Sequence, residues 1–209
     1  FGYAQSGHRL HASHQMIHQQ NAMIPAFVET ADDAGMVSFA CGDLIADFII
    51  DYKTLTGRPF FKAYLDAIQN NTRTDGNPDR ESSLIIHEDA NTILFVPKAQ
   101  ISEWELQLLT KSKIGNILEA DTDTRKSLDH GILTALKILD HLGAQLVTSI
   151  ELSKRFDNCE ASQHLLYSFI PRLPYAPGTF SEAQLRWISG CYPEDLALAC
   201  RMTLENITI

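Results

Sequence analysis

Apolar residues recur along this chain with two periods, and each period predicts a different kind of element. Residues 38–56, 60–69 and 122–142 repeat apolar side chains at intervals of three and four, which is typical of amphipathic helices. Residues 83–88 and 92–96 are short and rich in apolar residues, and the turn between them predicts a β-hairpin. The chain is therefore expected to mix helices with antiparallel strands.

The later segments continue this mixture. Partial alternation predicts strands over 104–109, 146–152 and 164–170, and Pro193 marks the first turn of a closing helix. Residues 70–80 (NNTRTDGNPDR) form the most loop-like stretch and the expected domain boundary. The order of elements predicts an α+β fold in which helices flank an antiparallel sheet.

Charge and cysteine content narrow the classes of function. The 209 residues carry 17 Lys and Arg against 26 Asp and Glu, a formal net charge of 17 − 26 = −9. This acidic balance predicts that polymeric nucleic acid is not a partner, although a small nucleotide needs only a few local donors. No apolar run approaches the roughly 20 residues of a membrane helix, so we expect no membrane association. The four cysteines form no CxxC pair and the first residues lack a secretory pattern, which predicts a cytoplasmic protein.

Candidate chemistry gathers near the start of the chain, where four of the eight histidines are clustered: His8, His11, His14 and His18. Three interpretations fit their spacing, namely a plain polar strand surface, a helical face that binds a metal ion, and a catalytic strand. We favour a strand, because the flanks are rich in glutamine and Ser6-Gly7 precedes the cluster. We expect His87, His130 and His141 to be surface or helix-flanking residues.

The remainder of the chain carries a recognisable order of short patterns. They are a hairpin that ends in Phe95-Val96-Pro97, the long helix, a strand that ends in Ile170-Pro171-Arg172, and a helix that begins Tyr192-Pro193-Glu194 with Ala197 and Arg201 after it. This order resembles the second half of galactose-1-phosphate uridylyltransferases, which belong to the histidine-triad superfamily. The resemblance implies a complete second histidine-triad-like lobe over residues 81–209. It also implies a partial first lobe with a helical connection over residues 1–80.

Residues 7–15 (GHRLHASHQ) resemble the catalytic strand of that family, which carries a His-Pro-His-Gly-Gln motif. Aligned on Gln15, His11 matches the first histidine, Ser13 stands at the nucleophile position, and His14 replaces the glycine. The family's nucleophilic histidine accepts the nucleotidyl group, and its glutamine hydrogen-bonds the phosphate oxygens. The resemblance therefore implies His11, Ser13, His14 and Gln15 as catalytic residues, with Gln15 also binding substrate.

Serine at the nucleophile position leaves three interpretations open, because a serine without an adjacent base is a weak nucleophile. A strand bulge would turn His14 onto the catalytic face, whereas regular alternation groups Ser13 with His11 and Gln15. In the second interpretation the protein is a relative that binds substrate but has lost the nucleophile. In the third, His11 acts in a rearranged catalytic site. We therefore expect a nucleotidyltransferase or phosphorylase that acts on a nucleotide sugar or related nucleoside phosphate. The alternative is a catalytically degenerate protein that binds a nucleotide or sugar phosphate.

The resemblance also bears on metals and on the remaining site residues. The two histidines that hold iron in the family match Leu166 and Ser168, and Glu29 is an approximate match for the family's glutamate. We therefore expect no iron and no cofactor, while a zinc site completed by residues upstream of this chain stays open. His164 and Arg172 are the candidate substrate-binding residues of the second lobe, with a packed strand histidine and a surface ion pair as the alternatives. The resemblance further implies a homodimer.

Overall fold

The computed structural model describes residues 19–31, 35–158, 162–173, 183–184 and 189–209. The chain divides into two compact units, residues 1–40 and residues 41–209. The helices of residues 41–69 thus belong to the same unit as the sheet that follows them. The predicted lobe boundary after residue 80 stays a prediction.

The first unit contains a short antiparallel hairpin in its described part. Strand β1 (Phe27–Val28) pairs with β2 (Met36–Val37). Gly35 precedes β2 with a φ of +63°, which glycine adopts without steric cost, and its N–H donates to Thr30 Oγ1 at 3.1 Å. Most of the predicted polar strand falls in residues 1–18, outside the described residues.

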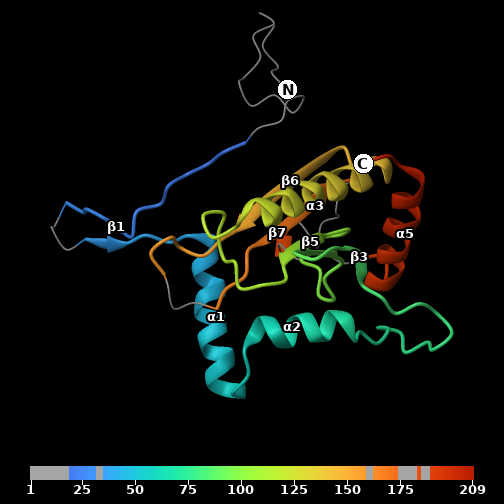
Figure 1. Ribbon diagram of the computed structural model, residues 1–209, viewed down its shortest axis with the longest axis horizontal. Coiled ribbons are helices and arrows are strands. Elements are labelled where there is room, and N and C mark those ends of the chain that lie inside the picture. The colour runs from blue at the N-terminus through green and yellow to red at the C-terminus, as the bar shows by residue number, and fades with distance from the viewer. Residues whose placement is uncertain (1–18, 32–34, 159–161, 174–182, 185–188) are drawn as a thin grey trace, which may run out of the picture. The chain divides into compact units, whose positions relative to one another are not determined.

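A five-stranded antiparallel sheet forms the centre of the second unit (Figure 1). Its strands are β3 (Ile85–Glu88), β4 (Thr92–Phe95), β5 (Leu106–Thr110), β6 (Leu146–Leu152) and β7 (Leu166–Arg172). They lie in the order β3-β4-β5-β7-β6, and every neighbouring pair is antiparallel. The predicted α+β fold with flanking helices is confirmed.

Two helices cover one face of the sheet. Helix α3 (Thr122–His141) begins at Asp121, whose side chain caps the helix by accepting from the Thr124 N–H at 2.8 Å. Helix α5 (Pro193–Asn206) packs beside α3 and starts with proline in its first turn. Their apolar side chains and one face of the strands form a single buried cluster: Ile86, Leu94, Val96, Leu106, Leu108, Leu128, Ala135, Ile138, Leu139, Leu165, Phe169, Leu196, Ala197 and Cys200.

Helices α1 (Cys41–Thr56) and α2 (Phe60–Gln69) contribute to a second cluster on the opposite face, where Figure 1 shows α2 across the sheet from α3. The cluster is Ile49, Phe61, Ile68, Leu84, Ile93, Phe95, Leu109 and Leu166. A Cβ on Gly42 would lie 1.8 Å from the Ser153 carbonyl oxygen, so this close approach of α1 requires glycine. No helix in the described ranges is long and apolar enough to cross a membrane.

Candidate functional site

The predicted catalytic residues His11, Ser13, His14 and Gln15 lie outside the described residues. Their roles therefore stay predictions. The described part of the second unit shows two polar networks at one end of the sheet, each around a buried carboxylate, and it also contains the predicted residues His164 and Arg172.

The first network surrounds the carboxylate of Glu105, which precedes β5 and is 1 % exposed. Its Oε1 accepts hydrogen bonds from Ser168 Oγ (2.8 Å) and Gln107 Nε2 (2.9 Å), and its Oε2 accepts from the Ile101 N–H (2.7 Å). Gln107 and Ser168 are register partners on β5 and β7, so both point to the same face as Glu105. Three neutral donors thus hold a buried charge, and hydrogen bonding of this kind offsets much of the cost of burying it.

Tyr64 extends this network from helix α2 to the sheet. Its hydroxyl donates to Gln107 Oε1 at 3.1 Å, while its ring meets Phe95 edge-on with centroids 5.8 Å apart. Burial raises the pKa of Tyr64 well above its usual value, and the negative charge of Glu105 raises it further. Tyr64 consequently keeps its proton and acts as a hydrogen-bond donor, and the hydrogen bonds run from Tyr64 through Gln107 to Glu105.

The network lies in a row of paired residues that crosses four strands, from a buried part of the sheet to a solvent-accessible part. Phe95, Gln107, Ser168 and Ile150 are successive register partners on β4, β5, β7 and β6. Phe95 is fully buried, whereas Ile150 on the outer strand is 37 % exposed. The polar side chains therefore lie next to an accessible stretch of the face that α2 covers only in part.

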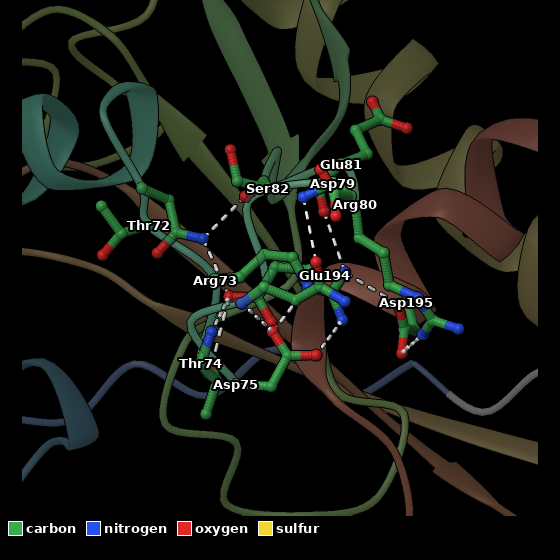
Figure 2. Close-up of polar contacts among 12 residues, drawn as sticks. Thr72, Arg73, Thr74, Asp75, Asp79, Arg80, Glu81, Ser82, Glu194 and Asp195 are labelled. Carbon is green, nitrogen blue, oxygen red and sulfur yellow. Dashed lines mark hydrogen bonds and ion pairs between the residues drawn. The ribbon is translucent and has the colours of Figure 1, made fainter.

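The second network, drawn in Figure 2, surrounds Glu194 at the start of α5, whose side chain is fully buried. Its Oε1 accepts from Lys98 Nζ (2.7 Å), Asn71 Nδ2 (2.9 Å) and both the N–H (3.1 Å) and hydroxyl (3.2 Å) of Thr74. Burial alone would raise the pKa of Glu194, but the bonds from Lys98 and Asn71 outweigh burial and lower it. Glu194 is therefore an ionised carboxylate that ties three segments together.

Arg73 completes the second network beside Glu194 (Figure 2). Its Nε and Nη2 bond both carboxylate oxygens of Asp75 at 2.9 and 3.0 Å, and its Nη1 bonds Asp195 Oδ1 at 2.9 Å. The bonds from Arg73 lower the pKa of Asp75 to about 2. Arg73 thus holds Asp75 within the loop by a two-point ionic bond, and its single bond to Asp195 ties the loop to the first turn of α5.

His164 is buried beneath α2, with 5 % of its surface exposed. Its Nδ1 lies 2.7 Å from the Thr110 carbonyl oxygen, and its ring stacks on Phe61 at 4.6 Å between centroids. Burial lowers the pKa of His164, so the ring is held neutral with Nδ1 as the donor. Arg172 is exposed at the end of β7. The predicted substrate-binding roles of His164 and Arg172 stay predictions.

Neither position matched to the family's iron-binding histidines holds a histidine: they are Leu166 and Ser168. Leu166 belongs to the apolar cluster under α2, and Ser168 donates to Glu105. Within the described ranges, no group of three or more His, Cys, Asp or Glu side chains comes together in a way that could hold a metal ion. The site residues that the structure does bring together are therefore hydrogen-bonding and ionic groups.

Several solved structures are similar to this chain in fold. A uridylyltransferase structure covers 80 % of this chain and 52 % of its own length, with a TM-score of 0.64 and 11 % identity. The match to an ADP-glucose phosphorylase from Arabidopsis thaliana with bound ADP-glucose covers 80 % of this chain and 49 % of the phosphorylase, with a TM-score of 0.57 and 19 % identity. The match to a GalT-like protein from the same plant covers 75 % of this chain and 48 % of that protein, with a TM-score of 0.53 and 19 % identity.

The chain spans about half the length of these solved proteins, since 52 %, 49 % and 48 % of them are covered. No family profile and no curated protein matches the sequence. The likeness therefore establishes a shared fold. The fold implied by the resemblance to galactose-1-phosphate uridylyltransferases is confirmed.

Sequence reasoning missed Glu105 and most of the groups around Glu194. The Tyr192-Pro193-Glu194 pattern did mark the start of α5, but nothing local connects Glu194 with Lys98, which lies 96 residues earlier in the chain. For Glu105, the available signal was a carboxylate directly before an apolar strand. A charge in that place is costly to bury without partners, and is therefore a candidate for a network.

Proposed function

We propose that the protein is a nucleotidyltransferase or phosphorylase that acts on a nucleotide sugar or related nucleoside phosphate. One observation carries the proposal: the fold of 80 % of the chain is shared with a uridylyltransferase and with an ADP-glucose phosphorylase. The histidine-containing segment before Pro25 supplies the expected chemistry. Cytoplasmic location and a homodimer are part of the same proposal.

The proposed reaction has two displacements at one phosphorus atom. A nitrogen of His14 attacks the α-phosphorus of the nucleotide sugar, the bond to the bridging oxygen breaks, and the sugar phosphate leaves with that electron pair. A second sugar phosphate, or inorganic phosphate, then attacks the same phosphorus and releases the histidine. Imidazole suits this role because it is nucleophilic near neutral pH and the resulting phosphorus–nitrogen bond is readily broken.

The other predicted residues support this reaction through phosphate recognition. Gln15 donates hydrogen bonds to the phosphate oxygens as negative charge develops there. His11 shapes the same phosphate site, and Ser13 is the alternative nucleophile. On the second lobe, His164 and Arg172 are the proposed contacts to substrate, and a guanidinium is well suited to a phosphate group.

Trapping of a labelled nucleotide tests the proposal directly. The full chain is incubated with UDP-glucose, a GDP-sugar, ADP-glucose and diadenosine polyphosphate, each labelled at the α-phosphorus, and the denatured protein is assayed for label. A phosphorus–nitrogen adduct on histidine is labile in acid and stable in alkali, whereas a phosphoserine ester shows the opposite behaviour. The lability of the adduct therefore identifies His14 or Ser13 as the nucleophile.

Single variants provide the matched control. His14→Ala is expected to abolish an acid-labile adduct, while His8→Ala, in the same histidine-rich segment, retains it. If none of the four substrates leaves a covalent label, the double-displacement mechanism is wrong. Size-exclusion chromatography with light scattering on the same protein tests the homodimer.

A second function is favoured by Ser13, which stands where the family has its nucleophile. In this alternative the protein binds a nucleotide or sugar phosphate and does not transfer it. Calorimetry with the same nucleotides would then show binding without turnover, and His14→Ala would leave the affinity unchanged. Turnover that depends on His14 would exclude this alternative.

A further inference from the structure

Two histidines meet on the side of the sheet away from α2, far along the chain from the predicted catalytic segment. His87 lies on β3 and His130 lies on α3, and their ring centroids are 5.2 Å apart with an interplanar angle of 63°. His87 is half-buried and His130 is exposed, so solvent reaches the pair. Neither ring has a role in the proposed transfer reaction.

We propose that His87 and His130 bind a divalent transition-metal ion such as Zn²⁺, with water completing its coordination. Neutral imidazole is the commonest protein ligand for such ions. In a tetrahedral site with Zn–N bonds of about 2.0–2.1 Å, two imidazole ring centres lie about 5 Å apart. The observed separation of 5.2 Å between the ring centroids matches this spacing.

The surrounding structure holds the two rings in place. Asn91, in the turn after β3, donates from Nδ2 to Ser127 Oγ at 3.1 Å, one helical turn before His130. Asp89 in turn fixes that hairpin by accepting from the N–H groups of Asn91 (2.8 Å) and Thr92 (2.7 Å). Helix α3 and strand β3 are thus cross-linked next to the histidine pair, which reduces the entropy lost when a metal ion bridges them.

Gly131 brings His130 close to the sheet. A Cβ at position 131 would lie 2.6 Å from Leu108 Cδ1, so a larger residue there would require Leu108 or α3 to shift. Because the described residues contain no third His, Cys, Asp or Glu at this place, the site has two protein ligands. Such a site is expected to be weaker than a structural zinc site with four protein ligands, and to exchange its metal.

Thermal unfolding of the full chain with Zn²⁺ or with a chelator tests the proposal, because an ion that bridges β3 and α3 binds only the folded state. Zn²⁺ is expected to raise the unfolding midpoint of the wild type. His87→Ala and His130→Ala should each reduce this rise and weaken binding to the pair at least about tenfold, since loss of a group that only hydrogen-bonds a metal ligand already costs about 10–100-fold in affinity. His141→Ala, an exposed histidine at the end of the same helix, should retain the rise. Zinc held by the histidines near the start of the chain is unaffected by these three variants.

Histidine ring NMR on the wild type provides a readout that does not depend on the folding of the variants. Saturating Zn²⁺ is expected to shift the ring signals of His87 and His130 together. Unshifted signals would show that the pair is a ring contact only and would overturn the proposal. A midpoint rise as large in both His87→Ala and His130→Ala as in the wild type would overturn it as well.

Discussion

Gly131 offers a test of how closely helix α3 packs on the sheet. Replacing it with alanine adds one methyl group that would lie 2.6 and 2.9 Å from the two Cδ atoms of Leu108. Alanine is favoured over glycine in a helix interior by about 1 kcal/mol. Overpacking a core costs about 1–3 kcal/mol, and we expect this cost to exceed the helix preference because Leu108 is buried in the cluster under α3, where its displacement disturbs its neighbours. Gly131→Ala is therefore expected to lower the free energy of unfolding by up to about 2 kcal/mol.

A double-mutant cycle isolates this contact. Leu108→Ala alone should cost about 2–5 kcal/mol, because it leaves a cavity under α3. In that background the methyl group of Ala at 131 enters the cavity, so Gly131→Ala should become stabilising by about 1 kcal/mol. The two substitutions should consequently be coupled by about 1–3 kcal/mol.

Equilibrium urea denaturation followed by tryptophan fluorescence measures each free energy, and equal m-values show that the variants unfold from comparable states. Leu139→Ala is the matched control. Leu139 belongs to the same cluster, but the three atoms nearest to a Cβ at position 131 all belong to Leu108. Its effect should add to that of Gly131→Ala within about 0.5 kcal/mol. If Gly131→Ala stabilises the wild-type chain by the full helix preference, the proposed close packing is wrong.

Three further predictions concern ionisable groups, of which Glu194 and His164 are buried and Asp75 is exposed. Glu194→Gln should lower the free energy of unfolding by about 1–3 kcal/mol, because Lys98 loses its counter-charge while the neutral hydrogen bonds remain; unchanged denaturation would contradict this. The pKa of Asp75 is lowered to about 2, so its stabilising effect is complete above its ordinary pKa and is lost as the pH falls from about 4 toward 2; Asp75→Asn should flatten that part of the stability curve. The pKa of His164 is also lowered, so the unfolded chain takes up its proton first and stability should fall as the pH drops below about 6.5; His164→Phe, measured over the same range, should remove this component.

Elements with local signals were predictable from the sequence. The apolar stripe of 122–142 predicted a helix, and in the structure this helix spans Thr122–His141, with Asp121 as its N-terminal cap and Gly143 after its end. The strand over 146–152 has the predicted limits. Each of these segments contains its own start or stop residue and its own period, so no distant contact is needed to define it.

Strand β5 shows where local reasoning fails. Alternation predicted a strand from residue 104, but the strand begins at Leu106 because Trp104 has a φ of +60°. That left-handed conformation costs a bulky residue about 1–2 kcal/mol, and it persists only where surrounding contacts compensate. Those contacts include the bond from the Ile101 N–H to Glu105, which no periodicity reveals.

The polar networks were hidden for a related reason. The contact between Glu105 and Ser168 depends on the register of β5 against β7, two strands that are far apart in the sequence. The polar composition of residues 70–80 predicted a loop at a domain boundary, and did not reveal that Arg73 within it is buried and ion-paired. Composition alone does not distinguish a charge in water from a charge whose partners arrive from elsewhere in the chain.

The two networks act on the same piece of chain, the connection between β4 and β5. Lys98 anchors its first part to Glu194, and the Ile101 N–H anchors its later part to Glu105. Because Leu106 pairs with Phe169, this connection lies at the end of the sheet where β7 finishes, which is also where Arg172 is placed. A binding group is most effective when its supporting backbone is fixed before the ligand arrives. If Arg172 binds phosphate as proposed, Glu194→Gln should therefore weaken nucleotide binding without any change at the contact itself, and Asp123→Asn, an exposed change at the distant start of α3, should not.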